Sequence, residues 1–234
     1  MTDSDPIVKL ENVGVCFSQR QGLFKRSTFW ALENISLNLY HGETLGVVGG
    51  NGAGKTTLLK ILSGFLEPSV GCYTNPGFRA SMLTLQLGFV HNLTGRDNAV
   101  LSGMLLGQTR QQMMAKMDAI VEFSELADFI DQPVRTYSAG MRARLGFSVA
   151  LEANPDILLI DEILGVGDST FRAKSTAALK SLIISDRTVV LVSHNMRLIK
   201  EMCDVVVHLD QGRANVYEDV SRGIAVYQKA GGEL

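Results

Sequence analysis

Gly49-Gly50-Asn51-Gly52-Ala53-Gly54-Lys55-Thr56-Thr57 is the stretch that decides the fold of this chain. It satisfies the pattern G-x-x-x-x-G-K-[ST] and lies between an apolar strand pattern, 44–48, and a helical pattern, 58–62. Its glycines let the backbone wrap around phosphates and direct successive N–H groups inward. The following helix adds the positive end of its dipole, Lys55 a point charge and Thr56 a hydroxyl for magnesium. The stretch therefore predicts a nucleoside-triphosphate site.

Composition limits the classes to which the chain can belong. Its 234 residues suit one domain, or a core with a smaller lobe, and a net charge of −2 provides no basic field for nucleic acid. No apolar run approaches the ~18 residues of a membrane span, and the acidic N-terminus lacks the apolar core of a signal peptide. Cys16, Cys72 and Cys203 are far apart and form no C-x-x-C pair. We therefore expect a cytosolic protein with reduced, buried thiols and no nucleic-acid partner.

Apolar periodicity indicates how the chain is organised. Strand patterns alternate with helical ones in the second half, which predicts a parallel sheet wrapped by helices. A mostly helical stretch in the middle is expected to form a lobe, at about 92–152, inserted into a single domain that spans 1–234. The expected strands are 7–17, 35–39, 44–48, 157–160, 188–192 and 205–209, the expected helices are 58–62, 97–106, 111–123, 138–151, 169–184 and 196–202, and 18–28 is expected to be a polar loop.

Two acids end one of the apolar strands. In Asp156-Ile157-Leu158-Leu159-Ile160-Asp161-Glu162, Asp161 lies at the carboxyl end of the strand, where a carboxylate that supports magnesium is expected in a phosphate-loop fold. Glu162 could orient or deprotonate the attacking water. Acids at strand ends are common, so the assignment depends on the phosphate loop upstream.

A second helix start has the features of an anion site. Ser138, in Thr136-Tyr137-Ser138-Ala139-Gly140-Met141, precedes a helical pattern and suits the N-cap position, a role that could explain it without any ligand. A capped helix start also binds anions, because the Ser138 hydroxyl and the Gly140 N–H are available to phosphate oxygens.

Together these motifs resemble the ATP-binding subunits of ABC transporters, in which the order is phosphate loop, signature, acid-tipped strand and switch histidine. The resemblance covers nearly the whole chain and implies an α/β fold. That fold is a RecA-like P-loop core with a parallel or mixed sheet, an N-terminal antiparallel β portion and an inserted helical lobe. Ser138-Ala139-Gly140-Met141 resembles the signature, His194 after Leu191-Val192-Ser193 the switch histidine, and Asp168 the D-loop aspartate.

The resemblance also suggests two contacts with ATP and magnesium. Phe17, at the end of the first strand, matches the aromatic residue that stacks on adenine; a core position is its competing interpretation, and Trp30 is a second candidate. Gln86 is the nearest match to the glutamine that senses magnesium and the membrane partner. His91 or Thr84 could occupy that position instead, because the alignment is loose there.

Further segments are similar to the exporters of bacterial cell-surface polysaccharides. They are Phe29-Trp30-Ala31-Leu32-Glu33-Asn34-Ile35-Ser36, Leu93-Thr94-Gly95-Arg96-Asp97-Asn98, Asp128-Phe129-Ile130-Asp131-Gln132-Pro133-Val134, Tyr137-Ser138-Ala139-Gly140-Met141 and the D-loop Gly165-Val166-Gly167-Asp168. This resemblance implies a homodimer with ATP and Mg²⁺ at its interface. It further implies that the dimer drives export of a lipid-linked O-antigen, capsule or teichoic acid through an integral membrane permease. The expected location is the cytoplasmic face of the bacterial inner membrane. Because the sequence ends at Leu234, we expect no C-terminal carbohydrate-binding domain.

Other function classes remain as alternatives. An ABC ATPase that serves another transported substrate would share these motifs. A regulatory module that binds ATP without hydrolysing it is expected to lack the acid at Glu162, which is present. An ABC ATPase acting on DNA or ribosomes would bring a coiled coil, a second ATP-binding domain or a basic patch, and a small GTPase would need an N-K-x-D motif. The sequence contains none of these.

Overall fold

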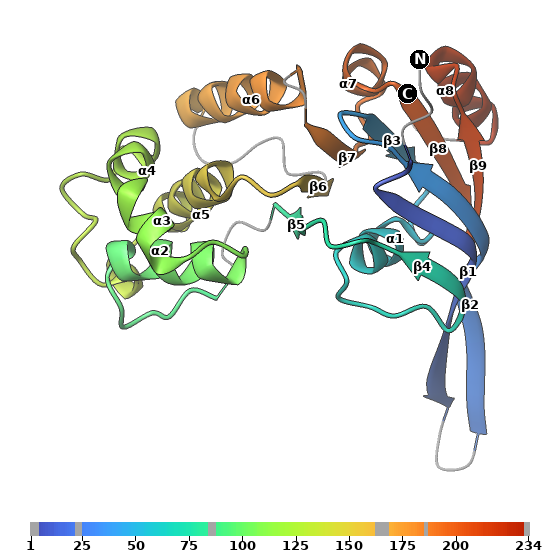
Figure 1. Ribbon diagram of the computed structural model, residues 1–234, viewed down its shortest axis with the longest axis horizontal. Coiled ribbons are helices and arrows are strands. Elements are labelled where there is room, and N and C mark those ends of the chain that lie inside the picture. The colour runs from blue at the N-terminus through green and yellow to red at the C-terminus, as the bar shows by residue number, and fades with distance from the viewer. Residues whose placement is uncertain (1–4, 22–24, 84–87, 162–168, 185–186, 232–234) are drawn as a thin grey trace. The chain divides into compact units, whose positions relative to one another are not determined.

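The computed structural model describes residues 5–21, 25–83, 88–161, 169–184 and 187–231. Contacts divide the chain into two compact units, whose elements are labelled in Figure 1. The first unit comprises the described residues of Met1–Met82, Asp156–Glu162 and Leu182–Leu234, and its framework is β-sheet. The second comprises the described residues of Leu83–Pro155 and Ile163–Ser181 and is helical.

The first unit is built on two sheets. A six-stranded sheet has the order β5-β6-β7-β3-β8-β9, in which the first five run parallel and β9 is antiparallel to β8. A three-stranded antiparallel sheet has the order β2-β1-β4. The expected fold class, α/β with a mixed sheet and an N-terminal antiparallel portion, is confirmed. The strands are β1 Val8–Gln21, β2 Lys25–Leu39, β3 Thr44–Val48, β4 Val70–Thr74, β5 Ala80–Met82, β6 Ile157–Asp161, β7 Thr188–Val192, β8 Val205–Asp210 and β9 Arg213–Tyr217.

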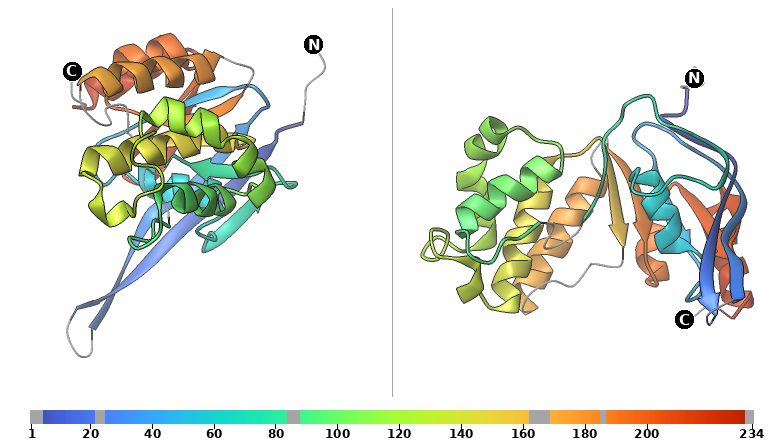
Figure 2. Two further views of the ribbon diagram at one scale, coloured as in Figure 1. Left: turned by 90° about the vertical axis from the view of Figure 1, so that its left-hand side faces the viewer. Right: turned by 90° about the horizontal axis from the view of Figure 1, so that it is seen from below.

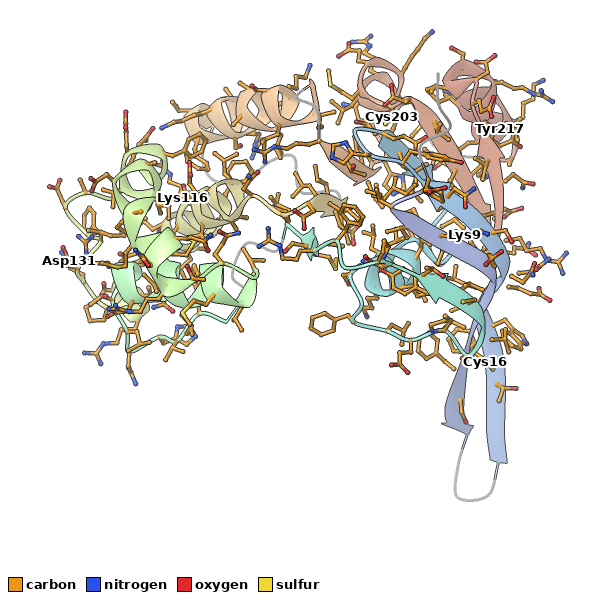
Figure 3. All side chains as sticks on the ribbon, in the orientation of Figure 1. Lys9, Cys16, Lys116, Asp131, Cys203 and Tyr217 are labelled. Atoms are coloured by element: carbon orange, nitrogen blue, oxygen red, sulfur yellow. The ribbon has the colours of Figure 1, made fainter. Side chains whose placement is uncertain are left out.

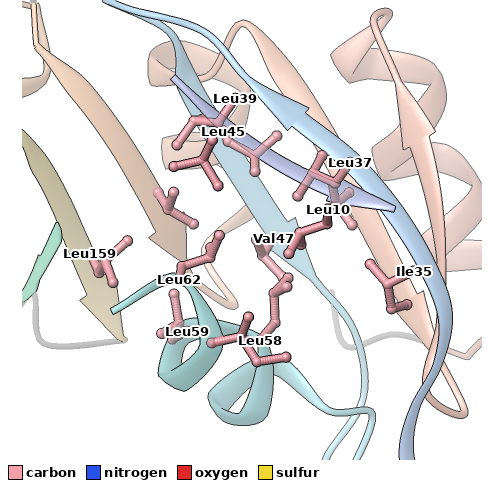
Figure 4. Packing of buried hydrophobic residues seen from close by; sticks show 14 of the residues in the cluster. Leu10, Ile35, Leu37, Leu39, Leu45, Val47, Leu58, Leu59, Leu62 and Leu159 are labelled. Carbon is pink, nitrogen blue, oxygen red and sulfur yellow. The ribbon is translucent and has the colours of Figure 1, made fainter. Parts of the chain in front are cut away.

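Burial of apolar residues explains why β3 holds the centre of this unit. Every residue of β3 is buried, and Leu45 and Val47 lie in the main core together with residues of the helix α1, Lys55–Leu62. Figure 4 shows leucines of α1 beside β3 and the inward faces of β1 and β2. Each fully buried leucine contributes about 1.5–3 kcal/mol, so the helix that follows the phosphate loop is held firmly to the sheet.

Parallel pairing brings the carboxyl ends of three strands to one edge of the sheet. Val192, the last residue of β7, pairs with Val47 on β3 and with Asp161 on β6. The carboxyl ends of these strands therefore coincide, and ligands of open α/β sheets bind at such an edge. The phosphate loop after β3 and the turn after β7 leave the sheet at this edge.

The segment 18–28 was expected to be a polar loop, and that expectation is wrong. The strands β1 and β2 pair through it, from Ser18 with Thr28 to Gln21 with Lys25, and form a long hairpin (Figures 1 and 2). Before it, Phe17 pairs with Phe29. Aromatic and β-branched residues pair well across strands, and the hairpin continues this pairing beyond them. The continuation is rich in polar side chains, so it lacks the alternation of apolar and polar residues that would predict a strand.

Two elements near the C-terminus were not predicted from the sequence. Strand β9 follows β8 through a turn at Gln211 and Gly212, whose positive φ values of 47° and 79° suit a tight hairpin. Helix α8, Val220–Lys229, follows, and its N-cap Asp219 accepts a hydrogen bond from the Arg222 N–H. The remaining helix of the first unit is α7, Met196–Met202.

The second unit is a cluster of helices. They are α2 Gly95–Leu105, α3 Arg110–Ala115, α4 Met117–Ser124, the short 3₁₀ helix Val134–Thr136, α5 Ala139–Ala153 and most of α6, Ser169–Ile184. The helix expected at 111–123 is broken at Lys116. Met113 and Met117 are buried, and Met114 is exposed. The lobe was expected at 92–152, whereas the contacts place residues 169–181 of α6 in this unit as well.

Burial of the cysteines differs from the expectation. Cys203 is buried (Figure 3), but Cys16 is half-buried and Cys72 is exposed on the edge strand β4. The expectation of buried thiols therefore fails for Cys72. Burial, with a smaller contribution from Asp204, raises the pKa of the Cys203 thiol to about 12. A thiol with this pKa stays protonated at neutral pH and is a poor nucleophile.

Within the described ranges, none of the helices combines the length and the apolar character that crossing a membrane would require.

Candidate functional site

The phosphate loop needs glycine at its two ends. A Cβ atom at Gly49 would collide with the backbone carbonyl oxygen of Leu209 on β8. Gly54, the N-cap of α1, has φ 107°, and a Cβ there would lie 2.6 Å from the carbonyl oxygen of Ala31. Any larger residue would displace the loop from the sheet at these positions, because left-handed backbone and close approach both favour glycine.

Lys55 lies in the first turn of α1 and turns back over the loop. Its Nζ donates hydrogen bonds to the carbonyl oxygens of Gly49 at 2.6 Å and Gly50 at 3.0 Å. Burial lowers the pKa of Lys55, and the charge of Asp161 opposes that shift. The ammonium group is thus held over the loop, where the negative charge of a bound triphosphate would pair with it.

Thr56 and Asp161 form the oxygen pair expected of a magnesium site. The Thr56 hydroxyl donates to Asp161 Oδ2 at 3.4 Å, joining α1 to the end of β6. Magnesium prefers hard oxygen ligands and is usually held by one or two carboxylates together with substrate phosphates and water. Among the described residues, no group of three or more His, Cys, Asp or Glu residues is suited to hold a metal ion by itself. The residues present fit Mg²⁺ bound with a nucleotide.

A pocket of 670 Å³ opens over the loop, within the first unit. This volume lies in the range of small-molecule sites. One wall is the loop and the start of α1; the others come from the β1–β2 hairpin, the ends of β6 and β7, and the β8–β9 turn. The lining residues are Phe17, Phe29, Trp30, Ala31, Asn51, Gly52, Ala53, Gly54, Lys55, Thr56, Thr57, Asp161, His194, Gln211 and Gly212.

Aromatic side chains form the wall opposite the loop. Phe17 and Phe29 have ring centroids 5.7 Å apart with a tilt of 38°, and Trp30 follows on β2. Their exposed fractions are 37%, 51% and 47%, so the rings present apolar faces to the pocket instead of filling the core. Phe17, the expected adenine contact, and Trp30, the second candidate, both line the pocket. Sequence reasoning missed Phe29, because its role depends on the cross-strand pairing with Phe17.

His194 lines the same pocket from the turn after β7. The turn is fixed by its neighbours: the Ser193 hydroxyl accepts from the Asn195 N–H at 3.1 Å, and the Asn195 side chain caps α7 by accepting from Arg197 and Leu198. His194 is thereby held close to the phosphate loop. Gln211 and Gly212 complete this side of the pocket and were not predicted.

The signature-like segment lies in the second unit. The Ser138 hydroxyl accepts from the Met141 N–H at 3.1 Å and so caps α5. Ala139 and Gly140 form the first turn, with Ser138 and Ala139 exposed. Tyr137 anchors the segment, because its hydroxyl donates to the Phe129 carbonyl oxygen at 2.7 Å. This geometry leaves an exposed helix N-terminus that is compatible with an anion.

Some predicted site residues lie outside the described residues. They are Gln86, Glu162 and Asp168, together with Thr84, the alternative to Gln86. His91, the other alternative, is exposed in the second unit, and its carbonyl oxygen accepts from the Arg135 N–H. The structure therefore brings together the predicted residues Phe17, Asn51 to Thr57, Asp161 and His194, with Gly49 and Gly50 in the same loop.

Comparison with known proteins identifies relatives along most of the chain. The model of the family described as ABC transporter matches residues 32–165. The teichoic acids export ATP-binding protein TagH of Lactococcus lactis is 46% identical over 86% of this chain and 43% of its own length. The O-antigen export system ATP-binding protein RfbB of Klebsiella pneumoniae is 43% identical over 89% of this chain and 85% of its own length. The chain thus spans less than half of the first relative and most of the second.

Solved structures show the same fold. One, described as the ATP-binding subunit of an ABC transporter, has a TM-score of 0.73 at 18% identity and covers 94% of both chains. Another, a dimeric ATP-binding cassette bound to ADP and Pi, has a TM-score of 0.71 at 23% identity and covers 90% of this chain and 97% of its own. At these identities the likeness supports the fold alone.

Proposed function

Because the chain belongs to the ABC transporter family, we propose that it is the ATP-hydrolysing subunit of a polysaccharide exporter. It would power the export of a lipid-linked O-antigen, capsule or teichoic acid through a separate membrane subunit. The observation that carries the proposal is the pocket that Lys55, Thr56 and Asp161 line together with aromatic residues of the three-stranded sheet. The cargo is inferred from the names of the relatives, and service to another transported substrate is the alternative.

Binding of ATP follows from the shape and charge of the pocket. The N–H groups of the loop and the Lys55 ammonium would hold the triphosphate, while Phe17 and Phe29 would stack on the adenine. Thr56 and Asp161 would hold Mg²⁺, which when bound neutralises charge on the phosphate oxygens. Phosphoryl transfer depends mainly on such positioning and electrostatic stabilisation.

Four further residues are proposed for the hydrolytic step. Glu162 follows Asp161 directly in the sequence and would take a proton from the attacking water. His194 would hold the γ-phosphate side of the site, and Asp168 and Gln86 are assigned their D-loop and magnesium-sensing roles by resemblance.

A second copy of the chain would complete each site. In the head-to-tail dimer that we propose, Ser138, Ala139 and Gly140 of one subunit approach the ATP held by the phosphate loop of the other. The exposed N-terminus of α5 supports this arrangement, because the N–H groups and the dipole of a helix start favour an anionic ligand. Closure on ATP and opening after hydrolysis would be transmitted to a membrane permease at the cytoplasmic face of the bacterial inner membrane.

Replacement of Glu162 by Gln tests the enzymatic part. The variant should hydrolyse ATP roughly 10²–10⁴-fold more slowly than the parent, because it cannot accept the proton, and should keep its ATP affinity. It should accumulate as an ATP-bound dimer on size-exclusion chromatography. A variant that hydrolyses at the parental rate would remove Glu162 from the mechanism, and a parent that binds ATP without turnover would support the regulatory alternative.

The cargo needs a separate experiment. Co-purification from detergent-solubilised bacterial membranes identifies the membrane subunit, and lipid-linked glycans are then added to the reconstituted complex. Stimulation of ATP turnover by a lipid-linked cell-surface glycan is the expected result. A complex whose turnover responds only to a solute-binding protein would contradict the export function.

A further inference from the structure

Three phenylalanine rings from three helices meet in the second unit. Phe123 of α4 stacks on Phe147 of α5, with centroids 5.8 Å apart and planes at 22°. Phe171 of α6 meets both rings edge-on, at 5.8 Å and 6.0 Å. Phe147 and Phe171 are fully buried. Edge-to-face pairs add about 0.5–1.5 kcal/mol each beyond burial, so the rings fix how α6 lies against α4 and α5.

A charged network covers the rings and centres on Glu125. Glu125 Oε2 accepts from Arg144 of α5 at 3.0 Å, and Oε1 accepts from Lys174 of α6 at 2.9 Å. Lys174 also donates to the Phe123 carbonyl oxygen at 2.9 Å and lies 4.7 Å from the centre of that ring. The Arg144 guanidinium lies 5.2 Å from the centre of the Phe171 ring. One carboxylate therefore ties α5 to α6.

The backbone at Glu125 is unusual for its residue type. Glu125 ends α4 in the left-handed conformation, with φ 58° and ψ 39°. Glycine is the residue that best suits this position, because the Cβ of other residues is unfavourable there. The left-handed backbone disfavours glutamate at this position. The Glu125 carboxylate nevertheless bridges Arg144 and Lys174, which glycine could not do.

Along the sequence, the network is only a few residues from two segments that the proposed function uses. Arg144 is six residues after Ser138, the cap of the signature-like helix, and Phe171 is three residues after Asp168. Both anchors thus belong to the first two turns of their helices. Any movement of α6 against α5 would displace the start of α6, which follows Asp168 in the sequence, relative to the exposed N-terminus of α5.

We propose that Glu125, Arg144 and Lys174, with the ring cluster beneath them, are positioning residues that hold the signature helix α5 and the helix α6 behind Asp168 as one rigid unit. This inference rests on the proposed ATPase function. All members of the cluster belong to the second unit, whereas the phosphate loop and the aromatic pocket belong to the first. The cluster therefore acts on closure and turnover and leaves nucleotide binding to a single chain unchanged.

Replacing Glu125 by Gly separates positioning from stability. The variant loses the bridge but gains a residue suited to the left-handed backbone, so its melting temperature should stay within a few degrees of the parent. Turnover at saturating ATP should fall roughly three- to tenfold, with the affinity of the monomer for ATP unchanged. A Glu125→Gly variant with parental turnover would overturn the proposal.

Further variants test whether the bridge itself matters. Lys174→Met should lower turnover by a similar factor, and Lys174→Arg, which keeps the charge and can still reach Glu125, should restore most of it. Combining Glu125→Gly with Lys174→Met should reduce turnover little further, because both remove the same link. Independent, multiplying effects would contradict a shared link.

A matched control and the parent protein complete the design. Glu122→Gln removes an exposed carboxylate from the same helix, outside the network, and should leave turnover at the parental level. Failure of the proposed function is recognised separately, because the parent chain itself would then show no ATP hydrolysis with its membrane subunit. Parental hydrolysis that is insensitive to the Glu125 and Lys174 variants would instead reject only the positioning role.

Discussion

At the scale of single residues, contacts within the phosphate loop hold the Lys55 side chain where a triphosphate would bind. Its ammonium group is bonded to the Gly49 and Gly50 carbonyl oxygens, so it is held at the loop and does not sample the solvent freely. Its lowered pKa records the cost of partial burial, which a phosphate group would offset by its charge. These contacts within the chain therefore hold the Lys55 side chain over the loop.

Lys55→Ala should weaken ATP binding by at least about tenfold, because the substitution removes the ammonium charge of Lys55 from the phosphate site. Binding of a fluorescent ATP analogue to the purified monomer measures this. Lys60→Ala, which removes an exposed lysine from the outer side of the same helix, should bind like the parent. Unchanged affinity in Lys55→Ala would contradict its role in the phosphate cradle.

Phe29 is the residue that the structure adds to the expected site. Phe29→Ala should weaken ATP binding roughly tenfold, because loss of one stacking ring costs about 1–3 kcal/mol. Phe65→Ala is the matched control, since Phe65 is 84% exposed in the same unit and does not line the pocket. Equal ATP affinity for the two variants, measured by titration calorimetry, would exclude stacking by Phe29.

At the scale of elements, local patterns predicted much of the fold. Strand β3, helix α6, strand β7 and helix α7 were expected with the bounds that they have, because each combines an apolar pattern with clear turn signals at its ends. The phosphate loop could also be located from the sequence, because its function depends on consecutive residues. Asp161 and His194 could be placed because parallel strands bring their ends to one edge.

The features that were missed depend on partners distant in the sequence. The hairpin extension at 18–28 is polar and is specified by pairing, and Phe29 enters the pocket only through that pairing. Strand β9 is an edge strand with mostly exposed residues, so its apolar signal is weak. The break at Lys116 interrupts a continuous helical pattern, so periodicity along the sequence did not reveal it.

Strand β8 carries a buried histidine that makes stability depend on pH. His208 is 5% exposed, its ring lies edge-on to Tyr227 at 5.6 Å, and its Nδ1 has no hydrogen-bond partner within the described part of the chain. Burial lowers the pKa of His208, against an opposing effect of Asp210. The folded protein thus keeps His208 neutral at a pH where the unfolded chain has bound a proton.

The sign of the pH dependence follows from this difference. Below the unfolded pKa of about 6.5 the unfolded chain binds more protons, so the free energy of unfolding should fall as the pH decreases from 7.5 to 5.5. His208→Leu should lose less stability over that interval, by at most about 1.4 kcal/mol per pH unit for one proton. Urea denaturation at both pH values measures this. The exposed His41→Gln variant should retain the parental dependence, and an identical slope in His208→Leu would exclude His208 as its source.

At the scale of the whole molecule, the chain carries two halves of an ATP site that we propose meet only between copies. The loop half lies in the first unit and the signature half, at Ser138 to Gly140, in the second. Two different defects can therefore be placed in separate chains. Lys55→Ala damages the first half. Gly140→Asp damages the second, because a carboxylate there repels phosphate. A Cβ at Gly140 has room, with the Ser138 hydroxyl oxygen its nearest neighbour at 3.7 Å, and an acidic residue suits the first turn of a helix.

Mixing the two variants distinguishes ATP sites shared between two chains from a complete ATP site within each chain. In a dimer with shared sites, one site of the mixed dimer carries both substitutions, and the other keeps Lys55 from one chain and Gly140 from its partner. The mixture should therefore form ATP-dependent dimers that hold one nucleotide, while each variant alone forms none. Size-exclusion chromatography with radiolabelled ATP, in the Glu162→Gln background to prevent turnover, measures both quantities. If each chain contained a complete site, every site in the mixture would carry one of the two defects, and no ATP-dependent dimer would appear. The single-nucleotide dimer is thus the outcome that separates a shared site from two independent ones.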